Sequence, residues 1–393
     1  MANEQEFETQ TLTNSHHTKP INGRFTPDIL VLIWARLPIK SLYQCRSVCK
    51  FWNSLITSDP LLSDLRHEFR HVPSLTPPPN LLLFLRHLSN EPVKVPDRPI
   101  LLSIRPFELL IKSDEDPVIR SIKNGFTPYN DYTLNIVPSN SKGPIICISA
   151  DNYFYLCNPS TQEFFRLSPG KNGNLTTSNA AFGYLDDLNQ YLLVGLKFGE
   201  KSEIFEFGPC EAGSNSWRQI IQQCPVKTRG FGLMVNRVFY WKVLDDTGFV
   251  VSLDIKEEKF KVIQPPIGNE NEVILHDLLY LVEFKGCLCA VDNFSKPPRM
   301  QIWILNENKE GEFNWVRRIN IFISGMDRDI VYPFCNYEGE NGAEIVLCND
   351  TRSRLYCYNM KNRSIKQVFR PKQRTNDRLG LYSPGLFPLS IAV

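Results

Sequence analysis

The pattern of apolar and polar positions changes in character at about residue 80. From residue 25 to about 70, apolar residues recur every three or four positions, the spacing of one face of an α-helix. After residue 100, short apolar runs rich in β-branched and aromatic residues alternate with clusters of Gly, Asn, Asp and Pro, which is typical of short strands joined by turns. We therefore expect a small all-α region followed by a large all-β region.

Prolines divide the helical region into predicted helices. The first begins at Thr26-Pro27-Asp28, where a capping Thr, a Pro in the first helical position and an acidic residue indicate a helix start. It ends at Leu37-Pro38, because the residue before a proline avoids helical geometry. Asp59-Pro60 predicts the start of a last short helix. The apolar stripes of the four helices are, in order, Ile29, Leu30, Ile33, Trp34 and Leu37; Leu42, Cys45, Val48 and Cys49; Val48, Trp52, Leu55 and Ile56; and Leu61, Leu62, Leu65 and Phe69.

The β region contains a repeated unit of strand, short polar turn and strand. The intervals between successive turns are 45, 50, 46, 52 and 53 residues. Most units have a further strand just upstream, and a 40–50-residue repeat of three or four strands is the signature of propeller blades. We expect about six blades, with a β-sandwich of irregular hairpins as the alternative. The predicted turns begin near Ser113, Asn158, Gly208, Asp254, Asn306 and Asn359.

Loop composition sets the expected domain limits. Residues 1–24 lack periodicity and are predicted to be a disordered tail, and residues 71–80 contain four prolines and are predicted to be a semi-rigid linker. The helical domain then spans 25–70 and the β domain 81–393. The C-terminal run at 386–393 is expected to pair with an early strand and close the ring, which would remove exposed sheet edges.

Charge and composition exclude several classes of function. Lys and Arg number 44 and Asp and Glu 42, so a net charge of +2 gives no long-range attraction to nucleic acid or to a membrane surface. No apolar signal segment opens the chain and no run of about 18 apolar residues occurs, so we expect a cytoplasmic or nuclear protein. The eleven cysteines are then expected to be free, mostly buried thiols.

Candidate chemistry is sparse. Of six histidines, only His276 lies well inside the repeats, and neither a phosphate-binding loop nor a nucleophile elbow is present. Cys287 and Cys289 would share one face of a strand with no other ligand nearby, so they are better explained as buried thiols than as metal ligands. We expect no catalytic residue, no cofactor and no metal. We expect four tryptophans of the β region to pack between blades, namely Trp217, Trp241, Trp303 and Trp315. The alternative is that some aromatic residues of this region anchor a bound target.

The helical segment at residues 25–60 closely resembles the plant F-box. The departures are Phe25-Thr26-Pro27 in place of Leu-Pro, Trp34 in place of Leu, and Gln44 in place of Arg, and the first two keep an apolar face. The residues that match the family pattern are Ile29, Ile33, Arg36, Leu37, Pro38, Lys40, Ser41, Leu42, Arg46, Val48, Lys50, Trp52, Leu55 and Ile56.

The β region resembles, more loosely, the F-box-associated, kelch-like repeat domain of the same plant family. The matching segments are CNPSTQEFFRLS, AFGYLDDLNQYLLVG, SNSWRQI, DIKEEKFKVIQPP and WVRRINI, and the Gly-Gly pair of true kelch repeats is missing.

The resemblance implies a non-catalytic subunit that recruits targets to an SCF-type ubiquitin ligase. The F-box would bind a Skp-type adaptor, and through it a cullin, while the β domain would bind a protein target. The alternatives are an F-box scaffold or decoy outside the ligase, and a propeller enzyme. Target-binding residues are not assigned, with loops 168–179 and 321–335 as candidates. The residues expected to form either the module core or the adaptor contact are Pro27, Ile29, Leu30, Ile33, Leu37, Pro38, Leu42, Val48, Cys49, Trp52, Leu55 and Ile56.

Overall fold

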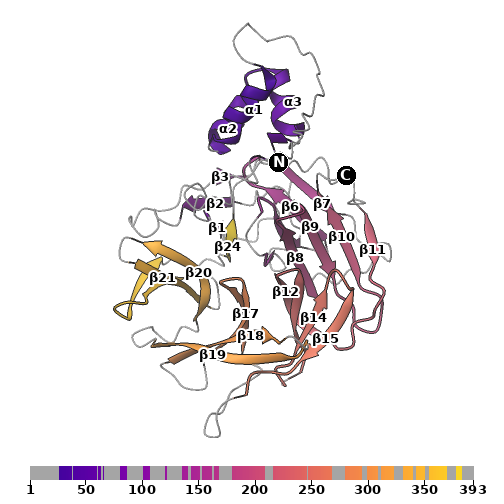
Figure 1. The fold of residues 1–393 in the computed structure, drawn as a ribbon, viewed down its shortest axis with the longest axis vertical. Helices are drawn as coiled ribbons and strands as arrows, with labels where there is room; N and C mark the ends of the chain where they lie inside the picture. Colours follow the sequence, from indigo (N-terminus) through magenta and orange to yellow (C-terminus); the bar gives the residue numbers. More distant parts are fainter. Residues whose placement is uncertain are drawn as a thin grey trace, which may run out of the picture. The chain divides into compact units, whose positions relative to one another are not determined.

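A computed structural model describes two compact units of the chain, Met1–Thr76 and Pro77–Val393, which we treat separately (Figure 1). The residues that the structure describes are 26–37, 39–59, 61–62, 65, 80–85, 101–106, 120–121, 135–139, 143–150, 153–161, 163–167, 179–208, 216–245, 247–267, 279–293, 299–308, 311–322, 331–339, 342–349, 354–369 and 378–382.

The first unit contains helices α1 (Pro27–Ala35), α2 (Ile39–Arg46) and α3 (Lys50–Ser58). The predicted start of α1 is confirmed, since Thr26 is the extended N-cap residue and Pro27 is the first residue of the helix. The Thr26 side chain makes no capping hydrogen bond. A cysteine caps α3 instead of a more usual residue, since Cys49 Sγ accepts a hydrogen bond from the Trp52 amide at 3.4 Å.

The last predicted helix is present in the part of the chain that the structure describes. Residues 61, 62 and 65 are helical, and Asp59 Oδ1 accepts a hydrogen bond from the Leu62 amide at 3.2 Å. Two residues of the second predicted stripe were wrongly placed. Val48 lies in the turn between α2 and α3, and Cys49 is the extended N-cap of α3, because α2 ends at Arg46.

The second unit consists of antiparallel four-stranded sheets in chain order. The strands, grouped by sheet from first to fourth position, are β24 (Arg378–Tyr382), β1 (Asn80–Leu85), β2 (Leu101–Pro106) and β3 (Arg120–Ser121); β4 (Asn135–Val137), β5 (Ile146–Ala150), β6 (Tyr153–Asn158) and β7 (Glu163–Leu167); β8 (Ala180–Leu185), β9 (Gln190–Gly195), β10 (Glu203–Phe207) and β11 (Trp217–Gln219); β12 (Thr228–Val235), β13 (Val238–Val243), β14 (Val250–Asp254) and β15 (Lys259–Ile263); β16 (Tyr280–Phe284), β17 (Cys287–Asp292), β18 (Arg299–Glu307) and β19 (Phe313–Phe322); β20 (Val331–Gly339), β21 (Gly342–Asn349), β22 (Leu355–Asn359) and β23 (Ser364–Phe369).

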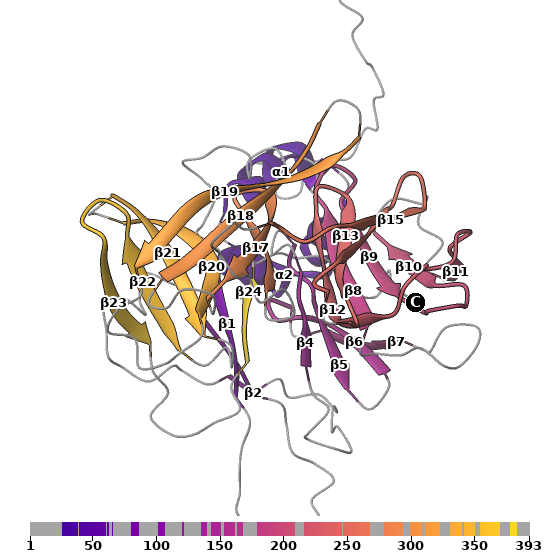
Figure 2. The same cartoon turned by 90° about the horizontal axis from the view of Figure 1, so that it is seen from below.

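These sheets are six propeller blades, as the repeat predicted. The third and fourth are joined into one eight-stranded sheet only by a single parallel pair, Gly232 with Ala181, between their first strands β12 and β8. The first strands of other successive blades also contact one another. Strand β4 contacts β24 and β8, and strand β16 contacts β12 and β20. The curled sheets are visible in Figures 1 and 2.

The ring closes through a strand other than the one expected. Strand β24 pairs antiparallel with β1, from Asn80 opposite Tyr382 to Phe84 opposite Arg378. The C-terminal segment therefore does return to an early strand, but the pairing residues are 378–382, whereas the expected run at 386–393 lies outside the described residues. Strand β24 thus serves as the first strand of the first blade, and it pairs an edge of β1 that would otherwise be exposed.

The predicted turns mark the boundary between the third and fourth strands of the blades. Asn158, Asp254 and Asn359 each end a third strand, and their side-chain oxygens accept hydrogen bonds from backbone amides two or three residues on, at 2.8–3.1 Å. Such Asx turns explain why Asn and Asp recur at this position. Gly208 and Asn306 lie at the equivalent places, and Ser113 is outside the described residues.

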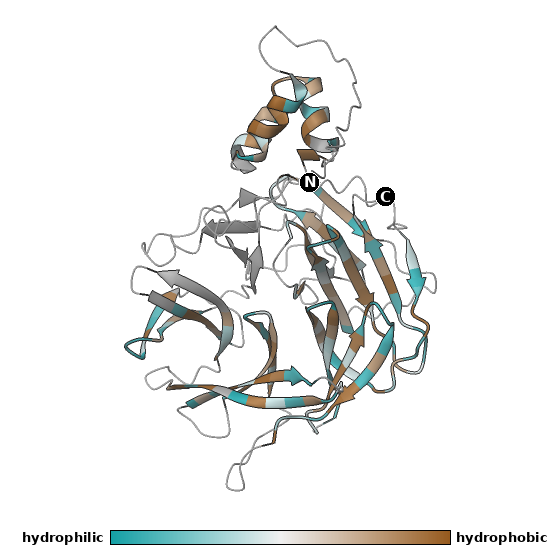
Figure 3. Ribbon diagram, viewed as in Figure 1, coloured by the Kyte–Doolittle hydropathy of each residue, from teal (hydrophilic) through white to brown (hydrophobic). Residues whose placement is uncertain are grey.

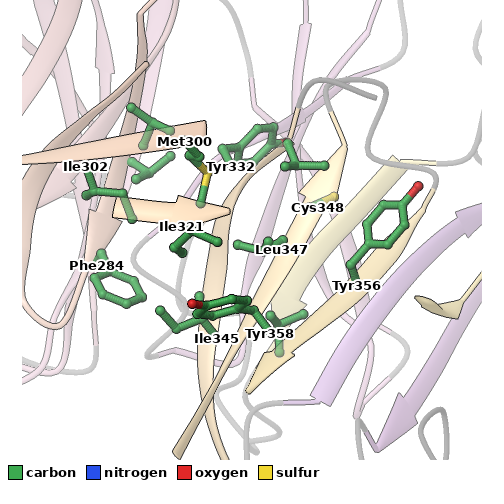
Figure 4. Close-up of a cluster of buried hydrophobic side chains, with 14 of the residues drawn as sticks. Phe284, Met300, Ile302, Ile321, Tyr332, Ile345, Leu347, Cys348, Tyr356 and Tyr358 are labelled. Carbon is green, nitrogen blue, oxygen red and sulfur yellow. The ribbon is translucent and has the colours of Figure 1, made fainter. Parts of the chain in front are cut away.

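Cores form between the faces of neighbouring blades. Buried clusters join the second blade to the third, the third to the fourth, the fourth to the fifth and the fifth to the sixth. Figure 4 shows the last of these, with Phe284 and Ile302 facing Ile345 and Tyr358. The third, fourth and fifth blades are thus covered on both faces, which accounts for the brown bands along their strands in Figure 3.

The predicted packing between blades is confirmed for three of the four tryptophans. Trp217 is buried between the second and third blades, and Trp241 between the third and fourth. Trp315 is half-buried against the cluster between the fourth and fifth blades, whereas Trp303 is buried in a cluster of residues from the fifth blade and the segment just before it.

The antiparallel order places the loops of each blade at two opposite ends. One end, here called the hairpin end, carries the turns between first and second and between third and fourth strands, such as 186–189, 236–237 and 285–286. The other, the crossover end, carries the second-to-third loops and the connections between blades, such as 196–202, 220–227 and 244–249. Of the candidate loops 168–179 and 321–335, the structure describes only residue 179 and the residues 321–322 and 331–335, which belong to β19 and β20.

Candidate functional site

Helix α1 has a buried face that forms the core of the helical unit. Val31, Trp34 and Ala35 are at most 5% exposed. The Trp34 ring meets the Trp52 ring of α3 edge to face, with centroids 5.0 Å apart. Leu42 of α2, Ile56 of α3 and Leu62 complete the set of buried apolar side chains described in this unit.

The opposite side of α1 is also apolar but is not covered by the chain. Ile29, Leu32 and Ile33 are 42%, 42% and 44% exposed, and their spacing of three and four residues places them on one face, called here the open face of α1. A helix that is apolar all round is normally buried all round. The open face is therefore the surface on which a partner is to be expected.

Further apolar side chains are exposed beyond α1. Val48 in the α2–α3 turn is 61% exposed, Phe51 at the start of α3 is 38% exposed and Leu61 is 46% exposed. Arg46, Lys50 and Asn53 accompany them, with Arg46 Nε donating a hydrogen bond to Asn53 Oδ1 at 2.9 Å. The unit thus presents apolar groups beside basic and amide side chains, as protein-binding surfaces do.

The structure divides the residues expected at the core or the adaptor contact. Leu42 and Ile56 are core. The half-buried members are Pro27, Leu30, Leu37, Trp52 and Leu55, the exposed members are Ile29, Ile33, Val48 and Cys49, and Pro38 lies outside the described residues.

Sequence reasoning missed three exposed residues, Leu32, Phe51 and Leu61, and one buried residue of α1, Val31. It assumed a single apolar stripe for α1. The signal that would have found Val31 and Leu32 is the near absence of polar residues in the segment PDILVLIWA, which leaves room for two apolar faces.

In the sheet unit, exposed apolar side chains meet at the crossover end of the third and fourth blades. Phe198 is 51% exposed and Leu244 is 53% exposed. Phe198 pairs through its backbone with Cys224, and Lys227 Nζ lies 5.5 Å from the centroid of the Phe198 ring. The Leu244 amide donates a hydrogen bond to the Lys227 carbonyl at 2.7 Å. These contacts join three loops into one surface, called here the crossover patch.

A buried ion pair lies at the base of the loop that carries Phe198. Lys197 Nζ is 3.9 Å from Glu203 Oε2, and both side chains are almost fully buried. Among the residues that the structure describes, neither the Lys197 ammonium nor the Glu203 carboxylate has a hydrogen-bond partner. Ser202 Oγ binds the Lys197 amide at 3.0 Å, which closes the loop.

No described group of three or more His, Cys, Asp or Glu side chains is arranged to hold a metal ion. Cys287 and Cys289 both face the cluster between the fifth and sixth blades, as the strand period predicted. Burial raises the pKa of the Cys289 thiol to about 12, and it also raises the pKa of Cys147 and Cys157. Thiols held protonated in this way are poor nucleophiles and metal ligands. Among the described helices, none is long and apolar enough to cross a membrane.

Comparison with known proteins agrees with the two units. Residues 27–65 match an F-box-like family model, and residues 108–378 match the model of the F-box associated beta propeller domain. F-box protein At5g49610 of Arabidopsis thaliana is 23% identical over 376 residues, covering 89% of this chain and 92% of the relative. F-box protein At5g18160 is 25% identical over 288 residues, covering 71% of this chain and 66% of the relative. F-box protein DOR is 24% identical over 362 residues, or 87% of this chain and 86% of the relative. The chain therefore belongs to the plant F-box proteins that carry an F-box associated β-propeller domain.

Proposed function

We propose that this protein is the target-recruiting subunit of an SCF-type ubiquitin ligase, acting in the cytosol or nucleus. The F-box, which we place at residues 25–70, binds a Skp-type adaptor and through it a cullin. A linker at 71–80 connects it to the β-propeller at 81–393, which binds the protein to be ubiquitinated. The observation that carries the proposal is the open face of α1.

The energetics of the open face support adaptor binding. Covering a large aliphatic side chain stabilises a complex by roughly 1.5–3 kcal/mol when burial is complete, and a few central residues dominate most interfaces. Ile29, Leu32 and Ile33 are each more than two-fifths exposed on one face of a helix whose other face is core. We place them at the centre of the adaptor contact, with Leu42 and Ile56 acting beneath it by holding the helices in place.

The protein's own contribution is proximity rather than bond chemistry. A chain that binds the adaptor with one unit and a target with the other raises the effective concentration of target lysines near the ubiquitin-loaded enzyme. The proposal assigns no proton transfer and no covalent intermediate to this chain.

The test is adaptor binding by an Ile29→Asp variant of the full chain. Ile29 is 42% exposed and lies in the first turn of α1, where a carboxylate interacts favourably with the helix dipole, so folding should be preserved. We expect binding of the purified adaptor, measured by calorimetry, to weaken by about 10- to 100-fold. Val262→Asp is the matched control, because Val262 is 45% exposed on β15 of the sheet unit.

Equal adaptor affinity of the wild type and the Ile29→Asp variant would refute the assigned surface, and no adaptor binding by the wild type would refute the ligase function. Target abundance separates the ligase from a scaffold. If the protein recruits targets for degradation, cells expressing the Ile29→Asp variant should accumulate the target, as should cells with an inhibited proteasome. A target that responds to neither would indicate a scaffold or decoy.

A further inference from the structure

From the crossover patch, we infer that the sheet unit binds its target through an acidic segment that carries an aromatic or branched aliphatic side chain. The patch is Phe198, Lys227 and Leu244, extended by Lys201, Arg229 and Lys242. This inference rests on the proposed function in one respect, namely that the protein bound at the patch is the target to be ubiquitinated.

The apolar part of the patch is held ready for a ligand. The loop of Phe198 is closed by Ser202, whose hydroxyl binds the Lys197 amide at 3.0 Å and whose carbonyl accepts from the Ile220 amide at 2.8 Å. Gly199 provides the left-handed backbone conformation at the tip, with φ of 71°. Because the loop is fixed in this way, little conformational entropy is lost when Phe198 is covered.

The charged part of the patch has an excess of cations. Arg229 and Lys242 face each other directly across β12 and β13, and like charges in this position repel. Arg229 and Lys201 are exposed, and neither they nor Lys227 form an ion pair with a carboxylate among the described residues. The pairing of β12 with β13 shifts register between Arg229 and Leu233, where Gly230 has a φ of 73°. Such a bulge bends the strand locally.

The structure describes two acidic residues here, which is fewer than the four cations of the patch. The Asp245 carboxylate accepts a hydrogen bond from the Thr247 amide at 3.2 Å, and another from its hydroxyl, so it is engaged within its own turn. Glu200 is exposed beside Lys201. Among the described residues, the four cations around Phe198 and Leu244 exceed these two carboxylates, so the patch keeps a net positive charge that an acidic partner would complement.

The hairpin end of the same blades shows the contrast. There Arg237 is paired with Asp187 of the neighbouring blade, and Asn236 Nδ2 binds the Gly286 carbonyl of the next blade at 2.9 Å. Arg237 is therefore paired within the protein, whereas Lys201, Lys227 and Arg229 of the crossover patch form no ion pair among the described residues. An apolar anchor flanked by cations fits a peptide better than a nucleic acid, since the aliphatic Leu244 offers a base no hydrogen bond.

Selection of peptides by the full-length protein tests this inference. We expect dodecapeptides selected from a random phage-displayed library to carry Asp or Glu next to an aromatic or branched aliphatic residue. Fluorescent copies in which the carboxylates are replaced by amides should bind at least tenfold more weakly. Phe198→Ala and Arg229→Glu should each weaken binding of the original peptides at least tenfold, and added salt should weaken it further. Leu188→Ala and Lys361→Glu, which change exposed residues at the hairpin end, should leave binding within twofold.

The inference is overturned if no peptide is recovered, if the recovered peptides lack carboxylates, or if the Phe198→Ala variant binds them as the wild type does. Tighter binding of a 20-nucleotide single-stranded DNA than of the peptides would also overturn it. Adaptor binding is measured separately. A protein that selects acidic peptides but binds no adaptor would refute the proposed function alone, and the converse result would refute only the patch.

Discussion

The two units of this protein treat apolar side chains in opposite ways. In the sheet unit the third, fourth and fifth blades each have both faces covered by apolar clusters shared with their neighbours, and even the charges of Lys197 and Glu203 are buried. In the helical unit, α1 has apolar side chains on two faces and the chain covers only one, leaving Ile29, Leu32 and Ile33 open. The difference separates residues that stabilise this chain from residues that are available to another.

The first way to break this comparison is to remove a side chain from between blades. Trp241 is fully buried between the third and fourth blades, and its indole Nε1 donates to the Asn179 carbonyl at 3.1 Å. We expect Trp241→Ala to lower the free energy of unfolding of the sheet unit by about 3–5 kcal/mol, measured by denaturant titration. Val262→Ala, at an exposed position, should change it by less than about 0.5 kcal/mol. A small effect at Trp241 would mean that the blades are not packed as described.

The second prediction concerns the buried ion pair. Lys197→Met removes the only described partner of the buried Glu203 carboxylate, which should cost about 3 kcal/mol or more, measured by the same titration. The double variant Lys197→Met with Glu203→Leu removes both charges and should recover most of that loss. If the two variants were equally unstable, shape and not charge would control the site.

Alkaline pH gives a third, smaller effect. Burial raises the pKa of Cys289 to about 12, whereas a thiol in the unfolded chain titrates near 9, so the unfolded state loses its proton first. The stability that comes from the protonated thiol is complete below about pH 9 and is lost as the pH rises toward 12. At pH 10 the loss for this one thiol is about 1.4 kcal/mol. Cys289→Ala should flatten the fall in stability between pH 8 and pH 10 by about that amount, and an unchanged slope would show that the thiol is accessible to water.

The smallest effect is expected at the surface contact between neighbouring blades. Arg237 and Asp187 pair at the hairpin end, with 46% and 61% of their side chains exposed. Exposed pairs contribute about 0–1 kcal/mol, so Arg237→Ala should change the free energy of unfolding by no more than that and less in high salt. A loss above 2 kcal/mol would show that ion pairs, and not the apolar clusters, hold the blades together.

Much of the fold was predictable because the repeats and the F-box pattern are local signals. Asn158, Asp254 and Asn359 mark third-to-fourth-strand turns through their own side chains, and Pro27 marks the start of α1. The closing strand at 378–382 was not predicted, since RLGLY is a weaker apolar run than the one at 386–393 and its pairing with β1 depends on the whole ring.

The candidate sites were predictable only in part. A stripe argument identified Ile29 and Ile33 but placed them on the same face as Trp34, because helical spacing alone does not show which of two apolar faces is covered. The crossover patch was not predicted, since Phe198, Lys227 and Leu244 come from three separate loops and meet only when two blades are packed.

The most direct test of the account is hydrogen exchange of the full-length protein, measured by mass spectrometry with and without a purified Skp-type adaptor. The adaptor should slow exchange in peptides that cover α1 and the start of α3, and it should leave peptides from the strands of the six blades unchanged. Protection confined to the blades, or no protection of residues 27–58 at adaptor concentrations that saturate binding, would contradict the account.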